Sequence, residues 1–185
     1  MDFRTAILAD VVRTYRNYKK LAESAITQIA DDDLHTLVDF EANSIAIIMK
    51  HVGGNLRSRF TDFLTSDGEK PDRNRDDEFE MPEPVSRAEL LALWERGWAA
   101  ALGAVEALTP DDLDRTVTIR GEPFLVAEAL NRSVTHTAYH VGQIVLLAKH
   151  FAGSRWSSLS IPKERSADYA KGTFKAGIIP RQETP

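Results

Sequence analysis

The chain of 185 residues contains no cysteine. Disulfide bonds, thiolate metal ligands and a cysteine nucleophile are therefore excluded, and any metal site must use other side chains. No apolar run approaches the roughly 20 residues that a membrane-spanning helix needs. The first residues, Met-Asp-Phe-Arg-Thr, also lack a basic stretch ahead of an apolar one, as a secretory signal would require. We therefore expect a cytoplasmic protein that does not contact a membrane.

An excess of positive charge is lacking as well. The 23 basic and 28 acidic residues give a net charge of −5, which argues against nucleic acid as a partner. Hydrophobic residues make up 43% of the chain and charged residues 28%, so a sizeable core can form. The length is long for one domain and short for two, and the sequence contains neither an internal repeat nor a low-complexity tract.

Apolar residues recur at three- and four-residue steps in four segments, which predicts four amphipathic helices. Asn43 or Ser44 is a suitable cap for the second helix, and Ser86 with Glu89 forms a capping box ahead of the third. Gly153 is a good stop for the fourth. The alternating, β-branched residues 116–119 predict a short extended piece that ends at Gly121. The expected helices cover about residues 3–29, 44–64, 86–108 and 123–151.

The long connection between the second and third helices bears on topology. Its roughly 20 residues, 66–85, can span about 65 Å when extended, whereas a helix of about 21 residues is only about 32 Å long. The connection can therefore cross the whole bundle. We predict an all-α, up-down-down-up four-helix bundle over residues 1–165. Residues 166–185 should form an irregular C-terminal tail that wraps the surface or is flexible, with at most a short helix near 163–170.

The sequence His136-Thr-Ala-Tyr-His140, followed by Val-Gly-Gln143, lies in the fourth apolar segment. Two histidines four apart on a helix lie on the same face, where both imidazoles can reach one metal ion. A third histidine, His51, ends the apolar run of the second helix. Three imidazoles leave Zn²⁺ or Ni²⁺ with an open position, as in reactive sites. The spacing alone leaves a second reading open, in which each is a hydrogen-bonded core histidine.

Other metal architectures do not fit this sequence. Zincins need a glutamate directly after the first histidine, where Thr137 stands. Ferritin-like di-iron bundles need two Glu-x-x-His motifs, and no glutamate here stands three residues before a histidine. The two remaining histidines, His35 in a turn and His150 near a helix end, are expected at the surface rather than at the metal.

Four further residues are candidates for metal-ligand support or substrate contact, namely Asn55, Gln143, Arg73 and Arg75. Asn55 and Gln143 share faces with the histidines, and Tyr139 is a further candidate contact, although packing or capping roles fit all three equally well. The two arginines lie in the mixed-charge run 72–78. Such a run is usually solvated surface. The functional alternative is a lid over the metal site, in which Arg73 or Arg75 holds a carboxylate by paired hydrogen bonds.

These motifs resemble the DinB/YfiT-like superfamily of metal-dependent enzymes. The matching residues are Ile48-Met49-Lys50-His51 and the pattern His-x-x-x-His-x-Gly-Gln from His136 to Gln143. Segments 50–55, 73–79 and 159–162 look like one branch of it that carries only a domain-of-unknown-function label. The resemblance covers about residues 1–165 and implies the same up-down-down-up bundle, with His51, His136 and His140 as metal ligands. Val141 stands where the superfamily often has a basic residue.

The resemblance also implies a function. Characterised superfamily members include thiol-dependent transferases and isomerases, and members are commonly dimers. We therefore expect a homodimeric, metal-dependent transferase or hydrolase that acts on a small molecule, with a low-molecular-weight thiol as a candidate partner. The alternative is a non-catalytic metal- or ligand-binding module of a sensing or stress-response kind. Because protons compete for imidazole near pH 6.5, metal affinity should weaken below about that pH.

Overall fold

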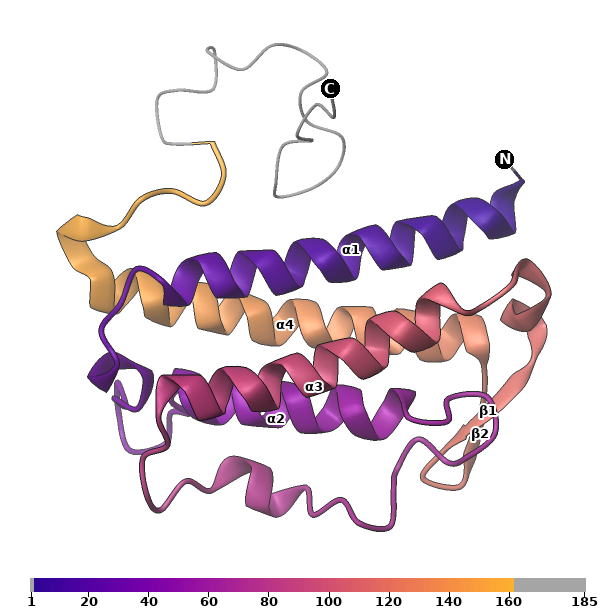
Figure 1. The fold of residues 1–185 in the computed structure, drawn as a ribbon, viewed down its shortest axis with the longest axis horizontal. Coiled ribbons are helices and arrows are strands. Elements are labelled where there is room, and N and C mark those ends of the chain that lie inside the picture. The colour runs from indigo at the N-terminus through magenta and orange to yellow at the C-terminus, as the bar shows by residue number, and fades with distance from the viewer. Residues whose placement is uncertain (1, 162–185) are drawn as a thin grey trace.

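The computed structural model describes residues 2–161, which form four long α-helices and a small hairpin (Figure 1). Helix α1 packs mainly on α4 and α2 mainly on α3, and α2 also contacts α4. The fold is thus mostly helical, as the sequence predicts. The predicted C-terminal tail and its short helix lie outside the described residues. The helices span α1 Phe3–Ile26, α2 Ile45–Phe60, α3 Arg87–Glu106 and α4 Val126–Ala152.

The connection between α2 and α3 runs back along the length of the helices (Figure 1). It includes a short 3₁₀ turn, Asp76–Phe79. In Figure 1 the chain runs through α1 and α4 in one direction and through α2 and α3 in the opposite direction. The long connection therefore returns the chain to the end of the bundle at which α2 began, and α3 begins there too. This course places the 3₁₀ turn against α2, close to the candidate metal ligands.

The predicted helix caps at Ser44, Ser86 and Gly153 are confirmed. The backbone N–H of Ile47 donates to Ser44 Oγ at 3.2 Å, and Ser86 and Glu89 form the reciprocal capping box. Gly153 follows the last residue of α4 with φ of +55°, a conformation that side chains with a Cβ disfavour. Capping hydrogen bonds therefore set the first two boundaries, and the backbone conformation that glycine permits sets the third.

The predicted start of the fourth helix near Pro123 is wrong. Residues 116–119 form β1 (Thr116–Ile119), as expected, but Pro123 lies in its antiparallel partner β2 (Glu122–Leu125), and α4 begins only at Val126. The two-residue turn between the strands has positive φ at both Arg120 and Gly121, as a tight hairpin requires. Proline is tolerated here because this two-stranded sheet consists only of edge strands. The first two helices also end earlier than expected, at Ile26 and Phe60.

Helices α2 and α3 approach each other closely through glycine. A Cβ atom built on Gly97 would lie 2.4 Å from the carbonyl oxygen of Gly53, and one on Gly53 would lie 3.0 Å from that of Leu93. Neither backbone can yield without moving a whole helix. The glycine at position 53, costly in a helix by propensity, is therefore explained by packing.

We expect Gly97→Ala to destabilise the protein by about 1–3 kcal/mol, because overpacking forces the two backbones apart. Gly103 in the same helix is the matched control, since a Cβ there would meet nothing within 4 Å. Gly103→Ala should instead stabilise by about 0.5–1 kcal/mol through helix propensity. Urea unfolding of both variants tests the pair, and equal effects would refute the close approach of the helices.

None of the helices among residues 2–161 combines the length and the apolar character needed to span a bilayer.

Candidate metal centre

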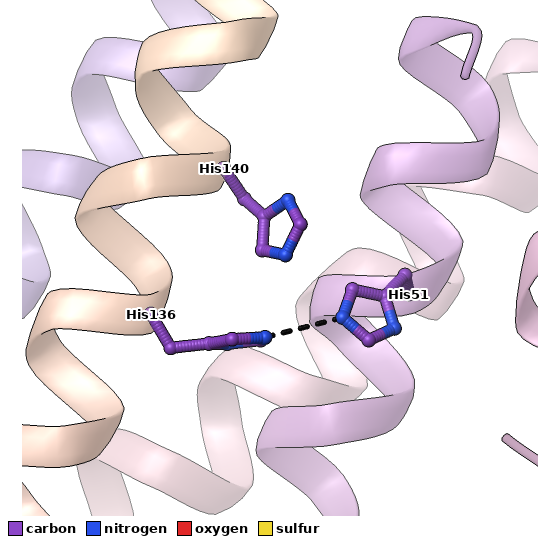
Figure 2. Close-up of side chains that lie close together, drawn as sticks. All are labelled: His51, His136 and His140. Carbon is purple, nitrogen blue, oxygen red and sulfur yellow. Dashed lines mark hydrogen bonds between the residues drawn. The ribbon is translucent and has the colours of Figure 1, made fainter. Parts of the chain in front are cut away.

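The three predicted histidines converge between α2 and α4 (Figure 2). His51 projects from α2, and His136 and His140 project from successive turns of α4. One ring nitrogen from each lies within 4.8 Å of the other two. His51 and His140 are buried and His136 is half-buried. The three side chains thus face one another from two helices, and the cluster could hold a metal ion.

The spacing of the ring nitrogens suits a divalent ion. His51 Nε2 lies 3.2 Å from His136 Nε2 (dashed line in Figure 2). Two nitrogens bound to one Zn²⁺ at 2.0–2.1 Å in tetrahedral geometry are separated by about 3.3 Å. Without a metal, one of these nitrogens donates its proton to the other. The donor set of three imidazoles, with no thiolate and no carboxylate among the ligand atoms, is of the kind that binds first-row transition metals.

Hydrogen bonds on the far side of two rings direct the Nε2 atoms towards the cluster. His51 Nδ1 donates to Glu78 Oε2 at 2.8 Å, because a carboxylate can only accept. His140 Nδ1 lies 2.8 Å from Gln143 Oε1, and the Gln143 amide donates to the Tyr139 hydroxyl at 3.3 Å. Protonation at Nδ1 leaves the lone pair on Nε2, which is the arrangement that metal-binding histidines need. Gln143 therefore supports His140 in the structure.

Glu78 is itself fixed by Arg73. The guanidinium group donates through Nε to Glu78 Oε1 and through Nη2 to Oε2, both at 2.8 Å, and Nη1 contacts Glu69 at 3.2 Å. The side chains of Arg73 and Glu78 are only 5% and 8% exposed. Opposed carboxylate and guanidinium groups in this geometry form a strong, directional pair. A chain of contacts thus runs from Glu69 through Arg73 and Glu78 to His51.

A glycine of α2 makes room for this carboxylate. A Cβ on Gly54 would lie 2.4 Å from Glu78 Oε1. Any larger residue would push Glu78 away from His51, so the second glycine of the pair serves the metal centre, whereas the first serves helix packing.

The expectation that the 72–78 run is solvated surface is wrong for Arg73. The paired hydrogen bonds that the sequence suggested do form, but the carboxylate is the protein's own Glu78. Arg75 is the exposed member, with a side chain 49% exposed whose guanidinium lies 4.9 Å from the Phe79 ring centre. The difference arises because the 3₁₀ turn folds Glu78 inward and draws Arg73 with it.

Burial lowers the pKa of both α4 histidines. The pKa of His136 falls from 6.5 to about 3, mainly through burial and then through repulsion from His140 and His51. Burial also lowers the pKa of His140, although the hydrogen bond with Gln143 opposes this. Burial raises the pKa of Glu78, but hydrogen bonds from Arg73 and His51 outweigh it, so that pKa lies below its ordinary value. A carboxylate and neutral α4 imidazoles are thus favoured at neutral pH.

These shifts predict how the metal-free protein responds to acid. Unfolded His136 takes up a proton near pH 6.5, but folded His136 does so only near pH 3. The unfolded state therefore binds more protons between these values, and stability falls as pH drops from 6.5 towards 3. His136→Asn should flatten this fall, whereas His150→Asn, on an exposed residue, should not. Urea unfolding in chelator at pH 7.5, 5.5 and 4.5 measures it, and identical slopes in all three proteins would contradict it.

The histidines lie in the wall of a cavity of about 640 Å³. Of the other predicted residues, Asn55, Arg73 and Arg75 line this cavity, as does Tyr139, whereas Gln143 contributes only through His140. The cavity wall is completed by apolar and polar residues from four parts of the chain: Arg59, Phe60, Phe63, Phe79, Ile119, Arg120, Ala129, Arg132, Ser133 and Thr135.

The remaining two histidines lie outside the cluster, as expected. His35 is half-buried, with its Nε2 3.0 Å from the carbonyl oxygen of Val85, and His150 is exposed. Sequence reasoning missed Glu78 and Glu69 as members of the site. The only available signal was the acidic character of the loop, which does not single out one glutamate.

Comparison with known families assigns the chain to a family. The family described as "Protein of unknown function (DUF1572)" matches residues 2–165. The chain belongs to this family. The match takes in all three histidines, Glu78 and Arg73. Comparisons with curated proteins and with solved structures gave no match.

Proposed function

We propose that this DUF1572 protein is a metal-dependent enzyme that acts on a small molecule, with His51, His136 and His140 as the ligands of one divalent ion. The observation that carries the proposal is the position of the cluster. The three imidazoles line a cavity of about 640 Å³, a volume that suits a small-molecule site. A closed structural site would have no need of such a space beside it.

The residues around the cluster favour transfer over hydrolysis. When bound, a divalent ion acts as a Lewis acid towards a water molecule or a thiol. Hydrolysis would also use a general base, and no aspartate or glutamate of residues 2–161 lines the cavity. Transfer of a low-molecular-weight thiol needs less from the protein, since the sulfur–carbon bond forms as the bond to the leaving group breaks and the thiol proton passes to solvent. We therefore propose thiol-dependent transfer first and hydrolysis second.

The chain's own residues supply orientation in this scheme. Glu78 and Gln143 hold two of the rings with Nε2 towards the cavity. Phe79 lies 4.5 Å from the His51 ring, measured between centres, and shields that ligand from water. Asn55, which is buried and lines the cavity, offers an amide for substrate.

The lack of a carboxylate base also favours a second candidate, a non-catalytic module that binds metal or ligand for sensing or stress response. The same site serves both functions, because a ligand cavity beside three imidazoles is equally able to bind without turnover.

We also propose a relationship to the DinB-like superfamily, an up-down-down-up topology, a homodimeric state, and zinc or nickel as the metal. The histidine positions on α2 and α4 support the superfamily relationship, and the course of the long connection in Figure 1 supports the topology.

Turnover distinguishes the two candidates. Untagged protein loaded with Zn²⁺ or Ni²⁺ should consume glutathione or cysteine with an alkyl halide faster than chelator-treated protein does. His136→Ala should abolish this gain, and His150→Ala should keep it. Metal retention without metal-dependent turnover of any thiol or ester would favour the sensor. Absence of stoichiometric metal would overturn the metal-dependent enzyme and the metal-binding form of the sensor.

A further inference from the structure

The charged side chains that line the cavity beside the three histidines are all positive, apart from the histidines themselves. Five arginines line it, from α2, the α2–α3 connection, the hairpin turn and α4: Arg59, Arg73, Arg75, Arg120 and Arg132. Among residues 2–161, no carboxylate joins them in the wall. A divalent ion at the histidines would add two more positive charges. A cavity of this composition concentrates anions.

Only part of this positive charge is neutralised from behind the wall. Glu69 lies 2.9 Å from both Arg59 and Arg120 and also contacts Arg73, which Glu78 holds as well. Two carboxylates thus serve three guanidinium groups. The side chains of Arg59 and Arg73 are buried and paired with carboxylates. They therefore contribute to the positive electrostatic potential of the cavity but are not free to reorient towards a ligand.

The remaining arginines have hydrogen-bonding capacity to spare. Arg75 is half-exposed and its nearest carboxylate, Asp76, is 3.7 Å away and itself 91% exposed. Arg132 is exposed and has no carboxylate partner within the described part of the chain, its guanidinium lying 5.8 Å from the Phe124 ring centre. Arg120 contacts Glu69 through Nε alone, and its terminal nitrogens have no hydrogen-bond partner among residues 2–161. These three side chains can turn towards a ligand.

Apolar side chains line the same cavity. They come from the end of α2 and its following turn, from the 3₁₀ turn and from β1: Phe60, Phe63, Phe79 and Ile119. A ligand that fills the cavity therefore meets three kinds of surface, namely imidazole nitrogens, aromatic rings and free guanidinium groups.

We propose that the site binds a small molecule with an apolar body and an oxyanion group, a carboxylate or a phosphate, which Arg75, Arg132 and Arg120 hold while another part of the molecule reaches the histidines. Arginine is suited to this role because its planar fork matches both oxyanions with paired hydrogen bonds. The proposal deepens the proposed function and rests on it for the orientation of the ligand. The oxyanion subsite itself is formed without the metal.

Binding to chelator-treated, metal-free protein tests the subsite directly. The probes are 3-phenylpropionate and phenyl phosphate, with neutral 3-phenylpropanol as the uncharged control, titrated calorimetrically at low and high NaCl. We expect at least one anion to bind about tenfold or more tightly than the alcohol, and less tightly at high salt. The anion that binds tighter identifies the oxyanion class. Equal binding of all three probes would overturn the proposal.

The variant that carries the test is Arg75→Gln combined with Arg132→Gln. It should lose about tenfold in anion affinity, while its melting temperature stays close to that of the wild type because both side chains are exposed. Arg115→Gln is the matched control, since Arg115 is half-exposed, pairs with Asp112 and does not line the cavity. Unchanged anion affinity in the double variant would also overturn the proposal.

A second variant separates this inference from the proposed function. His136→Ala should lose metal yet still bind the anionic probe in chelator. Anion binding that depends on the arginines in a protein that never retains metal would support the oxyanion subsite while the metal-dependent function fails. Tight metal binding without any anion preference would overturn the oxyanion subsite and leave the metal-dependent function standing.

Discussion

Replacing His51, His136 or His140 with alanine should lower Zn²⁺ or Ni²⁺ affinity by about a hundredfold or more. Loss of a residue that only supports a ligand typically costs 10–100-fold in affinity, and loss of a ligand itself should cost at least as much. The three rings offer nitrogens within 4.8 Å of one another, so each removal leaves only two. Elemental analysis of untagged protein and calorimetric titration at pH 7.5 measure the effect.

Two variants of the same substitution type provide the control. His35→Ala and His150→Ala should keep the full metal content, because neither ring belongs to the cluster. His35 contacts the Val85 carbonyl oxygen, so its variant also needs a melting curve to show that it is folded. Equal metal content in all five variants would remove the assignment of the site.

Replacing Arg73 with alanine should destabilise the protein by about 3–5 kcal/mol, because it leaves Glu78 buried without its guanidinium partner. For a chain of this size the melting temperature should fall by roughly 10 °C. Arg75, two residues along the same loop, is the matched control. Its side chain is half-exposed, so Arg75→Ala should cost less than about 1 kcal/mol.

Metal affinity provides a second readout for this pair. Arg73→Ala releases Glu78, and with it the orientation of His51, so affinity should fall about 10–100-fold in whatever fraction stays folded. Arg73→Met combined with Glu78→Leu should recover stability, since apolar replacement of a buried ion pair is often neutral or stabilising. It should not recover metal affinity, because His51 Nδ1 then has no acceptor. Similar melting temperatures for the Arg73 and Arg75 variants would show that Arg73 is not a buried structural partner.

The parts of the site that lie on helices were predictable from sequence. Helical periodicity alone places His136 and His140 on one face, and an apolar run ending in His51 indicates a buried face on a second helix. Glu78 was not predictable in this way. It reaches His51 across 27 residues of sequence, from a connection whose path depends on tertiary packing rather than on local propensity.

The hairpin shows the same limit. The alternating residues 116–119 were sufficient to predict one strand. Proline, however, is tolerated both in the first turn of a helix and in an edge strand, so Pro123 alone does not distinguish the two. Pro123 lies in a strand because it pairs with Thr118 across the hairpin, and the local sequence pattern does not encode that pairing.

His51 and His136 are 85 positions apart in the sequence, so a metal ion bound by both would link two distant parts of the chain. With no cysteine, the chain cannot form a covalent bridge between α2 and α4. An ion held by both helices would act as a reversible staple that closes a long loop, and such closure restricts the unfolded ensemble in the way a disulfide does. Folding would then respond to the concentration of free metal in the surroundings. A protein of this design would be most resistant to unfolding and proteolysis when metal is plentiful, and it would relax into a looser bundle when metal is scarce.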